Sequence, residues 1–211
     1  MVAGPVRGRW VALEGGEGSG KSTQARLLAE AIGALLTREP GGTALGAHLR
    51  GLLLDPAGAS IDARAEALLL AADRAQHVAE IVCPALDSGR DVVSDRSAFS
   101  FLAYQGHGRG LPLDDLRRIS DWAAAGVWPD IVILIDVRAE ETAARLRASG
   151  REPDRLESAG AAFHDRVRHG FAELAAAEPG RWIVVDGNGS VDRVASRVRA
   201  GWAAFTTSAD R

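Results

Sequence analysis

The stretch Trp10–Gln24 reads W-V-A-L-E-G-G-E-G-S-G-K-S-T-Q. Its first four residues, Trp10–Leu13, form an apolar run typical of a buried strand, and a helical pattern begins at Gln24. Between strand and helix lies G-x-x-x-x-G-K-S over Gly15–Ser22, which is the phosphate-loop motif in the strand–loop–helix order that it requires. A plain glycine-rich turn would leave the Lys-Ser pair at its end unexplained. We therefore predict a loop that binds the phosphates of a nucleotide.

The chemistry of this loop follows from its residue types. Glycines allow consecutive backbone N–H groups to turn inward and form an anion site at a helix N-terminus. Lys21 adds a mobile positive charge for the β- and γ-phosphates, and the Ser22 hydroxyl can hold Mg²⁺. The residues predicted to bind ATP are Gly15, Gly16, Glu17, Gly18, Ser19, Gly20, Lys21, Ser22 and Thr23.

Composition limits the class of protein. The 211 residues carry 25 basic and 28 acidic side chains, so the net charge of −3 provides no general attraction to nucleic acid or to an anionic membrane. The single cysteine, Cys83, excludes an internal disulfide and suits a reducing compartment. Residues 1–9 lack the apolar run of a signal peptide, and no stretch approaches a membrane span. We expect a cytoplasmic protein that binds neither nucleic acid nor membrane.

Apolar runs alternate with helical patterns in five β–α units. The expected strands are 10–13, 34–37, 91–94, 131–135 and 181–186. The expected helices are 24–32, 45–54, 63–86, 97–106, 113–126, 139–147, 159–177 and 191–205. This order predicts a single domain over residues 1–211, a three-layer α/β fold around a five-stranded parallel sheet. Pro84 is expected to kink or shorten its helix, and Trp122 to lie in the core or at an interface.

Polar residues follow the expected strands, at the sheet edge where ligands bind in open α/β folds. Asp95 ends a buried strand beside the phosphate loop, where a partner of hydrated Mg²⁺ would lie. The segment Arg38–Thr43 is either a ligand contact or an ordinary turn with solvated charges. Arg74 lies beside an apolar helix stripe, where an arginine is usually paired or extended toward solvent, so a ligand role for it needs further support.

Residues 147–157 form a short polar segment with three arginines, Arg147, Arg151 and Arg155, around a glycine and a proline. A solvated connection is one interpretation. Because guanidinium groups match the charge of a phosphoryl group in transfer, we favour a lid that closes over the nucleotide phosphates.

Eight motifs occur in order along nearly the whole chain: E-G-x-E-G-S-G-K-S-T at Glu14–Thr23, T-R-E-P-G-G-T at Thr37–Thr43, A-D-R-A-Q-H-V at Ala72–Val78, D-R-x-x-x-S-x-x-A-Y-Q-G at Asp95–Gly106, R-G-L at Arg109–Leu111, P-D at Pro129–Asp130, I-D-V at Ile135–Val137 and D-R-L-E at Asp154–Glu157. Together they resemble the bacterial thymidylate kinases, in the nucleoside-monophosphate kinase group of phosphate-loop proteins. The resemblance implies a P-loop NTPase-type fold, a homodimer, and Mg²⁺-dependent transfer of a phosphoryl group from ATP to dTMP that gives dTDP.

The resemblance also implies roles for single residues. Arg96 and Arg50 would bind the acceptor phosphate, and Asp95 with Ser22 would hold the metal. Arg74 and Gln105 are similar to the residues that recognise the pyrimidine base. Glu17 and Glu39 would lie near the sugar and the metal, with Tyr104 under the deoxyribose. The full set of implied acceptor residues is Glu17, Glu39, Arg50, Leu70, Arg74, Arg96, Ser100, Phe101, Tyr104 and Gln105.

The catalytic arginine of this family comes either from the phosphate loop or from the lid. Gly18 occupies the loop position here, so the chain resembles the lid type. Arg147, Arg151 and Arg155 are then the catalytic candidates beside Lys21 and Arg96, and we favour Arg151 because it lies centrally beside Gly150.

Three positions depart from the family pattern. Leu70 replaces a phenylalanine that stacks on the base, Phe101 replaces a small polar residue, and Ser97 replaces an aromatic residue or histidine. One hypothesis is that Phe101 has taken over the stacking surface, and the alternative is that Leu70 packs on the base while Phe101 faces the core. A kinase for another pyrimidine monophosphate, such as dUMP or a modified deoxypyrimidine, and a nucleotide-hydrolysing switch remain the alternative functions.

Overall fold

Five short strands form the sheet that the sequence predicts. In the computed structural model, which describes residues 6–58, 60–148, 150 and 152–209, these strands are β1 (Trp10–Glu14), β2 (Leu35–Arg38), β3 (Val92–Asp95), β4 (Ile131–Asp136) and β5 (Trp182–Asp186). Every neighbouring pair is parallel, and the order across the sheet is β2-β3-β1-β4-β5. The apolar runs of β1 and β4 are buried on both faces, as expected for central parallel strands.

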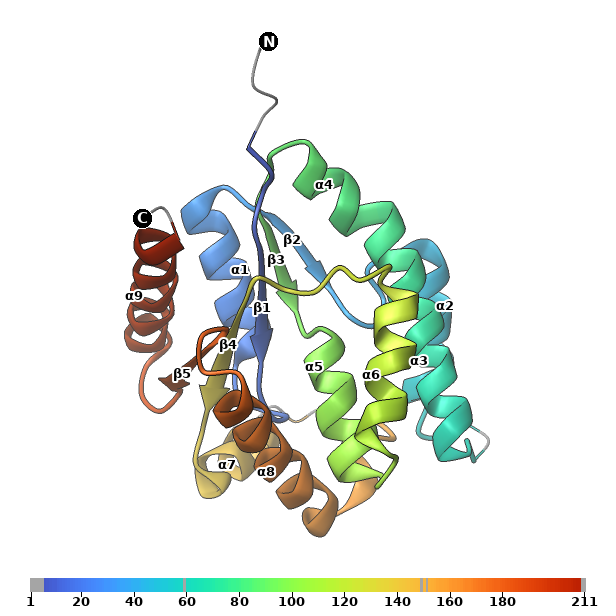
Figure 1. Cartoon of the computed structure of the whole chain (residues 1–211). Coiled ribbons are helices and arrows are strands. Elements are labelled where there is room, and N and C mark those ends of the chain that lie inside the picture. Colours follow the sequence, from blue (N-terminus) through green and yellow to red (C-terminus); the bar gives the residue numbers. More distant parts are fainter. Residues whose placement is uncertain (1–5, 59, 149, 151, 210–211) are drawn as a thin grey trace.

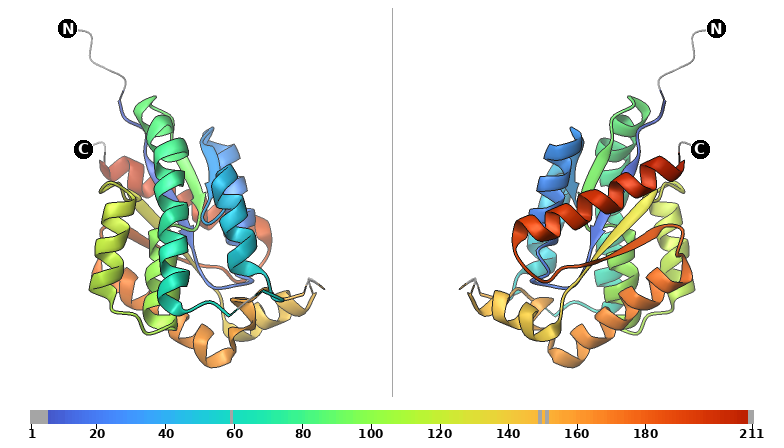
Figure 2. Two further views of the ribbon diagram at one scale, coloured as in Figure 1. Left: turned by 90° about the vertical axis from the view of Figure 1, so that its right-hand side faces the viewer. Right: turned by 90° about the vertical axis from the view of Figure 1, so that its left-hand side faces the viewer.

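Helices cover both faces of the sheet and make the three-layer architecture (Figure 1). Helices α1 (Lys21–Ile32) and α9 (Val191–Ala209) pack on one face, and α9 runs across that face in the right-hand view of Figure 2. The other face carries α8 (residues 161–177) and three helical runs, over residues 63–87, 98–108 and 113–123. The remaining helical elements are α2 (Ala44–Leu54), α3 (Ala63–His77), η1 (Val78–Val82), α4 (Cys83–Asp87), α5 (Ala98–Phe101), η2 (Leu102–Gly108), α6 (Leu113–Ala123), α7 (Ala139–Ala148), η3 (Glu157–Ala159) and α8 (Ala161–Ala177).

The long helix expected over residues 63–86 is present but changes its winding before Pro84. Asp62 caps its start, because the Asp62 carboxylate accepts a hydrogen bond from the Arg64 amide at 3.0 Å. The π-helical segment η1 follows α3, and the Cys83 amide bonds to the Val78 carbonyl, five residues back. This wider turn makes room for a proline that cannot donate a backbone hydrogen bond.

The helix expected over 113–126 ends earlier, at Ala123, since Ala125 and Gly126 both adopt positive φ angles. The expectation that Trp122 lies in the core is wrong, because its side chain is 86% exposed. The alternative that it lies at an interface is taken up below. None of the helices in the part of the chain that the structure describes has the length and apolar character needed to cross a membrane.

Parallel strands bring their carboxyl ends to one edge of the sheet. Glu14, Arg38, Asp95, Asp136 and Asp186 therefore end their strands at this edge. Helix α7 projects beyond it in both views of Figure 2. The candidate site is built at this edge.

Candidate active site

The phosphate loop connects β1 to α1. Gly20 occupies the N-cap of α1 with a φ of 87°, a left-handed conformation that glycine adopts without strain. Gly15 must also lack a side chain, since a Cβ there would lie 2.8 Å from the Ile135 carbonyl oxygen. The loop thus places backbone amides at the N-terminus of a twelve-residue helix, which is the geometry of an anion site.

Lys21 is buried within this loop and donates to the Gly16 carbonyl oxygen at 3.0 Å. Burial and the nearby positive charge of Arg96 lower the pKa of Lys21, although Glu17 and Asp95 partly offset them. A buried cation that donates to a carbonyl oxygen gains strongly from a phosphate anion. Lys21 thus lies in the loop as a buried cation, and its role in binding ATP phosphates stays a prediction.

Arg96 faces the phosphate loop from the end of β3. Its φ of 72° is a left-handed conformation that is costly for a non-glycine residue, and such strain is concentrated at functional sites. The guanidinium pairs with Glu17, donates to Tyr104 Oη at 3.1 Å, and donates to Ser100 Oγ at 3.0 Å. It also lies 4.9 Å from the centroid of the Tyr104 ring. These contacts join four predicted site residues, from the loop, β3 and the following helix.

The carboxylate of Glu17 receives a second hydrogen bond, from Tyr104 Oη at 2.7 Å. Burial would raise the pKa of Glu17, but the charges of Arg96 and Lys21 outweigh it and hold the pKa well below its usual range. Glu17 is therefore ionised at neutral pH and balances the charge of Arg96.

A cavity of about 430 Å³ opens between these residues, within the range of small-ligand sites. Four arginines line it: Arg38, Arg50, Arg74 and Arg96. Burial, together with the positive charges of Arg38 and Arg96, lowers the pKa of Arg50. Mutually repelling guanidinium groups in a concave site favour an anion such as phosphate. Arg38 was not among the predicted ligands, although it belongs to the T-R-E-P-G-G-T motif.

The other end of the cavity combines an aromatic ring with a buried ion pair. Glu39 accepts hydrogen bonds from Arg74 Nε at 3.1 Å and His77 Nδ1 at 3.0 Å. Burial opposes ionisation of Glu39, but Arg74 and His77 lower its pKa. The Arg74 guanidinium carbon lies 5.0 Å from the centroid of the Phe101 ring, and Leu70 lines the same cavity. Phe101 is 2% exposed yet contributes to the cavity wall, so the two hypotheses for its role remain open.

Gln105 lies at the same end and is held by Glu66, a buried residue that the sequence did not single out. Gln105 Nε2 donates to Glu66 Oε1 at 2.9 Å. Arg109 donates to both Glu66 oxygens at 3.2 Å, and Arg155 Nη2 lies 2.6 Å from Glu66 Oε2. Gln105 and Arg109 lie 39 and 43 residues away from Glu66 along the chain, and Arg155 lies farther still, so no local pattern could reveal these partners.

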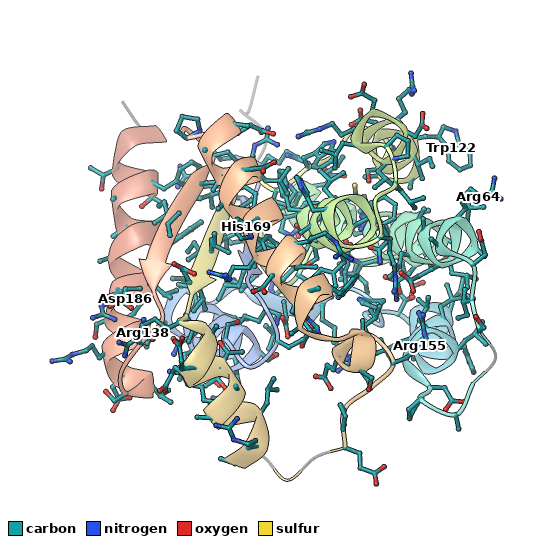
Figure 3. All side chains as sticks on the ribbon, turned by 90° about the horizontal axis from the view of Figure 1, so that it is seen from below. Arg64, Trp122, Arg138, Arg155, His169 and Asp186 are labelled. Carbon is teal, nitrogen blue, oxygen red and sulfur yellow. The ribbon has the colours of Figure 1, made fainter. Side chains whose placement is uncertain are left out.

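The last residues of the predicted lid are fixed to α2 and α3. Asp154 accepts hydrogen bonds from the Leu156 and Glu157 amides at 2.9 Å, and its own amide donates to Glu157 Oε2, a reciprocal pattern like that of a capping box in the turn that leads into η3. Arg155 Nε donates to the Leu53 carbonyl at 2.7 Å. Figure 3 shows Arg155 beside α2, across from α7.

The structure says less about the other two predicted lid arginines, Arg147 and Arg151. Arg147 is exposed on α7, and Arg151 lies outside the described residues. Arg145 of α7 hydrogen-bonds to the phosphate loop: it donates to the Ser19 carbonyl at 3.4 Å, and also to the Gly187 carbonyl at 3.1 Å. It was missed because its i,i+4 spacing from Glu141, which it also pairs with at 3.0 Å, is that of an ordinary surface ion pair.

The metal prediction can be tested against two side chains. Asp95 Oδ1 is buried and has no hydrogen-bond partner among the described residues, and both Asp95 and Ser22 line the cavity. A carboxylate oxygen and a hydroxyl next to a phosphate site are the donors that Mg²⁺ accepts in such proteins. The residues present therefore fit the metal.

Ser97 and Ser100 hydrogen-bond to a further buried carboxylate, that of Glu14. Ser97 Oγ donates to Glu14 at 2.7 Å, and both the amide and hydroxyl of Ser100 donate to the same side chain. Burial raises the pKa of Glu14 to about 7, although these hydrogen bonds and the charge of Arg96 oppose the rise. Ser97 is one of the three departures from the family pattern, and its hydroxyl donates one of the hydrogen bonds that the buried Glu14 carboxylate accepts.

A phosphate loop that faces an arginine-lined cavity across the carboxyl edge of a parallel sheet defines a phosphate-loop nucleotide kinase. The family model described as thymidylate kinase matches residues 13–198, and the chain belongs to this family.

Relatives and a solved structure agree with this assignment. The chain is 46% identical over 197 residues to a thymidylate kinase of Cutibacterium acnes, covering 91% of this chain and 95% of the relative. It is 47% identical over 199 residues to a thymidylate kinase of Clavibacter michiganensis, covering 92% and 94%. The crystal structure of thymidylate kinase from Ehrlichia chaffeensis superimposes with a TM-score of 0.76 at 31% identity, covering 93% of this chain and 99% of the other.

Proposed function

We propose that this chain transfers the γ-phosphoryl group of ATP to dTMP, giving ADP and dTDP. The observation that carries the proposal is the placement of two anion sites around one cavity: the phosphate loop with Lys21, and Arg96 with Arg50 facing it. Family membership supplies the acceptor, since the relatives are named thymidylate kinases.

On the donor side, the loop amides and Lys21 hold the phosphates of ATP. Arg145 and the loop at Gly187–Asn188 form the adjoining surface, where the nucleotide base would lie. Ser22 and Asp95 would hold Mg²⁺, which would supply positive charge to the phosphates of ATP. The unpartnered oxygen of Asp95 supports this assignment.

On the acceptor side, Arg96 and Arg50 hold the phosphate of dTMP. Glu17 keeps Arg96 oriented in its absence, and Tyr104 packs against the Arg96 guanidinium where the deoxyribose would lie. The acceptor phosphate is already ionised at neutral pH, so the chain needs no strong general base. The rate then depends on alignment of the two phosphates and on neutralisation of their charge.

The base lies between Arg74, Leu70, Phe101 and Gln105. Arg74 is fixed by Glu39 and Gln105 by Glu66, so both polar groups are held in place before the base arrives. Such preorganisation reduces the entropy lost on binding.

The transition state receives its additional positive charge from the lid. Glu66 and Leu53 hold Arg155 at the acceptor side, so we assign the direct contact to Arg151, with Arg147 as the second candidate. Arg155 then anchors the end of the lid segment.

A coupled assay of ADP release across dTMP, dUMP, UMP and dCMP tests the proposal. Highest kcat/KM with dTMP is expected, and a higher value with dUMP would favour the alternative pyrimidine kinase. ATP turnover that is independent of every monophosphate would contradict transfer and favour a nucleotide switch. The cluster of Arg38, Arg50 and Arg96 opposes that switch, because hydrolysis alone needs no second phosphate site.

We further propose that the chain forms a homodimer in the cytoplasm. Leu68 on α3 is 60% exposed and Trp122 on the adjacent α6 is 86% exposed. Figure 3 shows Trp122 projecting from the same side of the molecule as Arg64 of α3. Burial of these two apolar side chains against a second copy would remove them from water. Light scattering should report twice the 22.2 kDa chain mass, and Trp122→Glu should shift it to the monomer.

A further inference from the structure

The buried carboxylate of Glu66 hydrogen-bonds to Gln105, a residue that lines the cavity. Glu66 is 0% exposed, so each of its oxygens depends on protein donors. Oε1 accepts from Gln105 and Arg109, and Oε2 accepts from Arg109 and faces Arg155. Three elements far apart in the chain, α3, η2 and the end of the lid, therefore meet at this one side chain.

The arginines keep Glu66 in its charged form. Burial alone would raise its pKa, but the hydrogen bonds from Arg109 and Gln105 and the ion pair with Arg155 lower it below the ordinary value. An ionised carboxylate accepts hydrogen bonds and donates none. Only the NH₂ end of the Gln105 amide can therefore face Glu66, at the observed 2.9 Å.

This constraint leaves the amide oxygen of Gln105 as the end that can meet a base. Thymine and uracil present an N–H donor at ring position 3, whereas cytosine presents a bare nitrogen acceptor there. An amide oxygen pairs with the donor and repels the acceptor. An amide that could rotate by 180° would present its NH₂ group and accept cytosine instead.

Building on the proposed function, we infer that Glu66 is a positioning residue that selects the acceptor base: by fixing the Gln105 amide in one orientation, it admits bases with an N3–H donor and rejects cytosine. Glu66 does not touch the substrate, and it acts through Gln105. Buried hydrogen-bonding groups that are fixed in orientation discriminate strongly, because the wrong partner leaves both groups unpaired.

The test is the ratio of kcat/KM for dTMP to kcat/KM for dCMP in the Glu66→Gln variant. A neutral amide at position 66 can donate as well as accept, so Gln105 is free to rotate. We expect the ratio to fall by about tenfold or more. A purely structural role would lower both values together and leave the ratio unchanged, so an unchanged ratio in folded Glu66→Gln overturns the inference.

Three controls make the result specific. Glu66→Asp keeps an acceptor-only carboxylate and should retain most of the ratio even if both rates fall. Glu80→Gln makes the same chemical change at an exposed position of the same helical run and should change nothing. If Glu66→Gln does not fold, the double variant Glu66→Gln/Arg155→Met removes one positive charge with the carboxylate, and its ratio decides the question by the same criterion. A wild-type protein that fails to phosphorylate dTMP would refute the proposed function itself, which the ratio does not test.

Discussion

Replacement of Glu14 by glutamine should make the protein more stable at alkaline pH while leaving its stability near pH 5 almost unchanged. Glu14 is completely buried at the end of β1, and the hydrogen bonds from Ser97 and Ser100 do not fully compensate the loss of water. Its pKa in the folded protein is about 7, against an ordinary value of 4.5. Glutamine keeps the shape and an acceptor oxygen for Ser97 but carries no charge at any pH.

The direction and magnitude of this pH-dependent change in stability follow from the linkage between proton binding and folding. Because the folded-state pKa is raised, the fold favours the protonated carboxyl; this stability is complete below pH 4.5 and is lost as pH rises through 7. At about 1.4 kcal/mol for each pH unit between the two values, the loss approaches roughly 3 kcal/mol at pH 8. The stability difference between Glu14→Gln and wild type should therefore grow by about 2–3 kcal/mol between pH 5 and pH 8.

Urea unfolding at pH 5, 6, 7 and 8 measures this difference, with the chain concentration fixed because a dimer would make stability concentration-dependent. The matched control is Glu30→Gln, which removes an exposed glutamate paired with Arg26 and should change the free energy of unfolding by less than about 1 kcal/mol at every pH. A Glu14→Gln difference that is the same at pH 5 and pH 8 would refute the reasoning, since the buried carboxylate would then impose no cost on folding.

Three further predictions concern catalysis. Lys21→Ala and Arg96→Ala should each lower kcat/KM at least ~10²-fold without unfolding, because each removes a charge that holds a reacting phosphate; circular dichroism checks the fold, and near-normal turnover would refute the assignment. Tyr104→Phe should lower kcat/KM for dTMP by about tenfold, because the hydroxyl that bonds Glu17 and Arg96 is lost, while discrimination against ribonucleotides should persist because the ring remains. Asp95→Asn should raise the Mg²⁺ concentration needed for half-maximal turnover several-fold, measured by titration in the coupled assay, and an unchanged requirement would exclude Asp95 as a metal partner.

The elements of this fold could be predicted because their signals are local. Buried parallel strands such as β4 are continuous apolar runs, and Asp62 and Gly33 mark helix ends by their capping chemistry. Pro84 was expected to kink or shorten its helix, but the helical run continues to Asp87, and the π-helical segment η1 before the proline could not be predicted from the sequence. Trp122 shows the limit for single side chains, because an apolar residue in an amphipathic helix does not reveal whether another chain covers it.

Some residues of the candidate site could likewise be predicted from local sequence signals, and others could not. The phosphate loop is one continuous segment, so its residues could be predicted together, and Lys21 lies where the motif places it. Glu66 and Arg145 escaped notice because their partners are distant along the chain and only the fold brings them together. Arg155 could be recognised as part of a polar segment, but its ion pair with Glu66, rather than its position in that segment, determines where its charge lies.

The central claim is that two phosphate sites face each other across one cavity, one at Lys21 and one at Arg96. A crystal structure with a two-headed adenosine–thymidine oligophosphate tests it most directly. The account predicts oligophosphate oxygens on the loop amides and Lys21, the thymidine-side phosphate on Arg96, and the thymine ring against Arg74 and Gln105. A thymidine end bound anywhere other than beside Arg96 and Gln105 would contradict it.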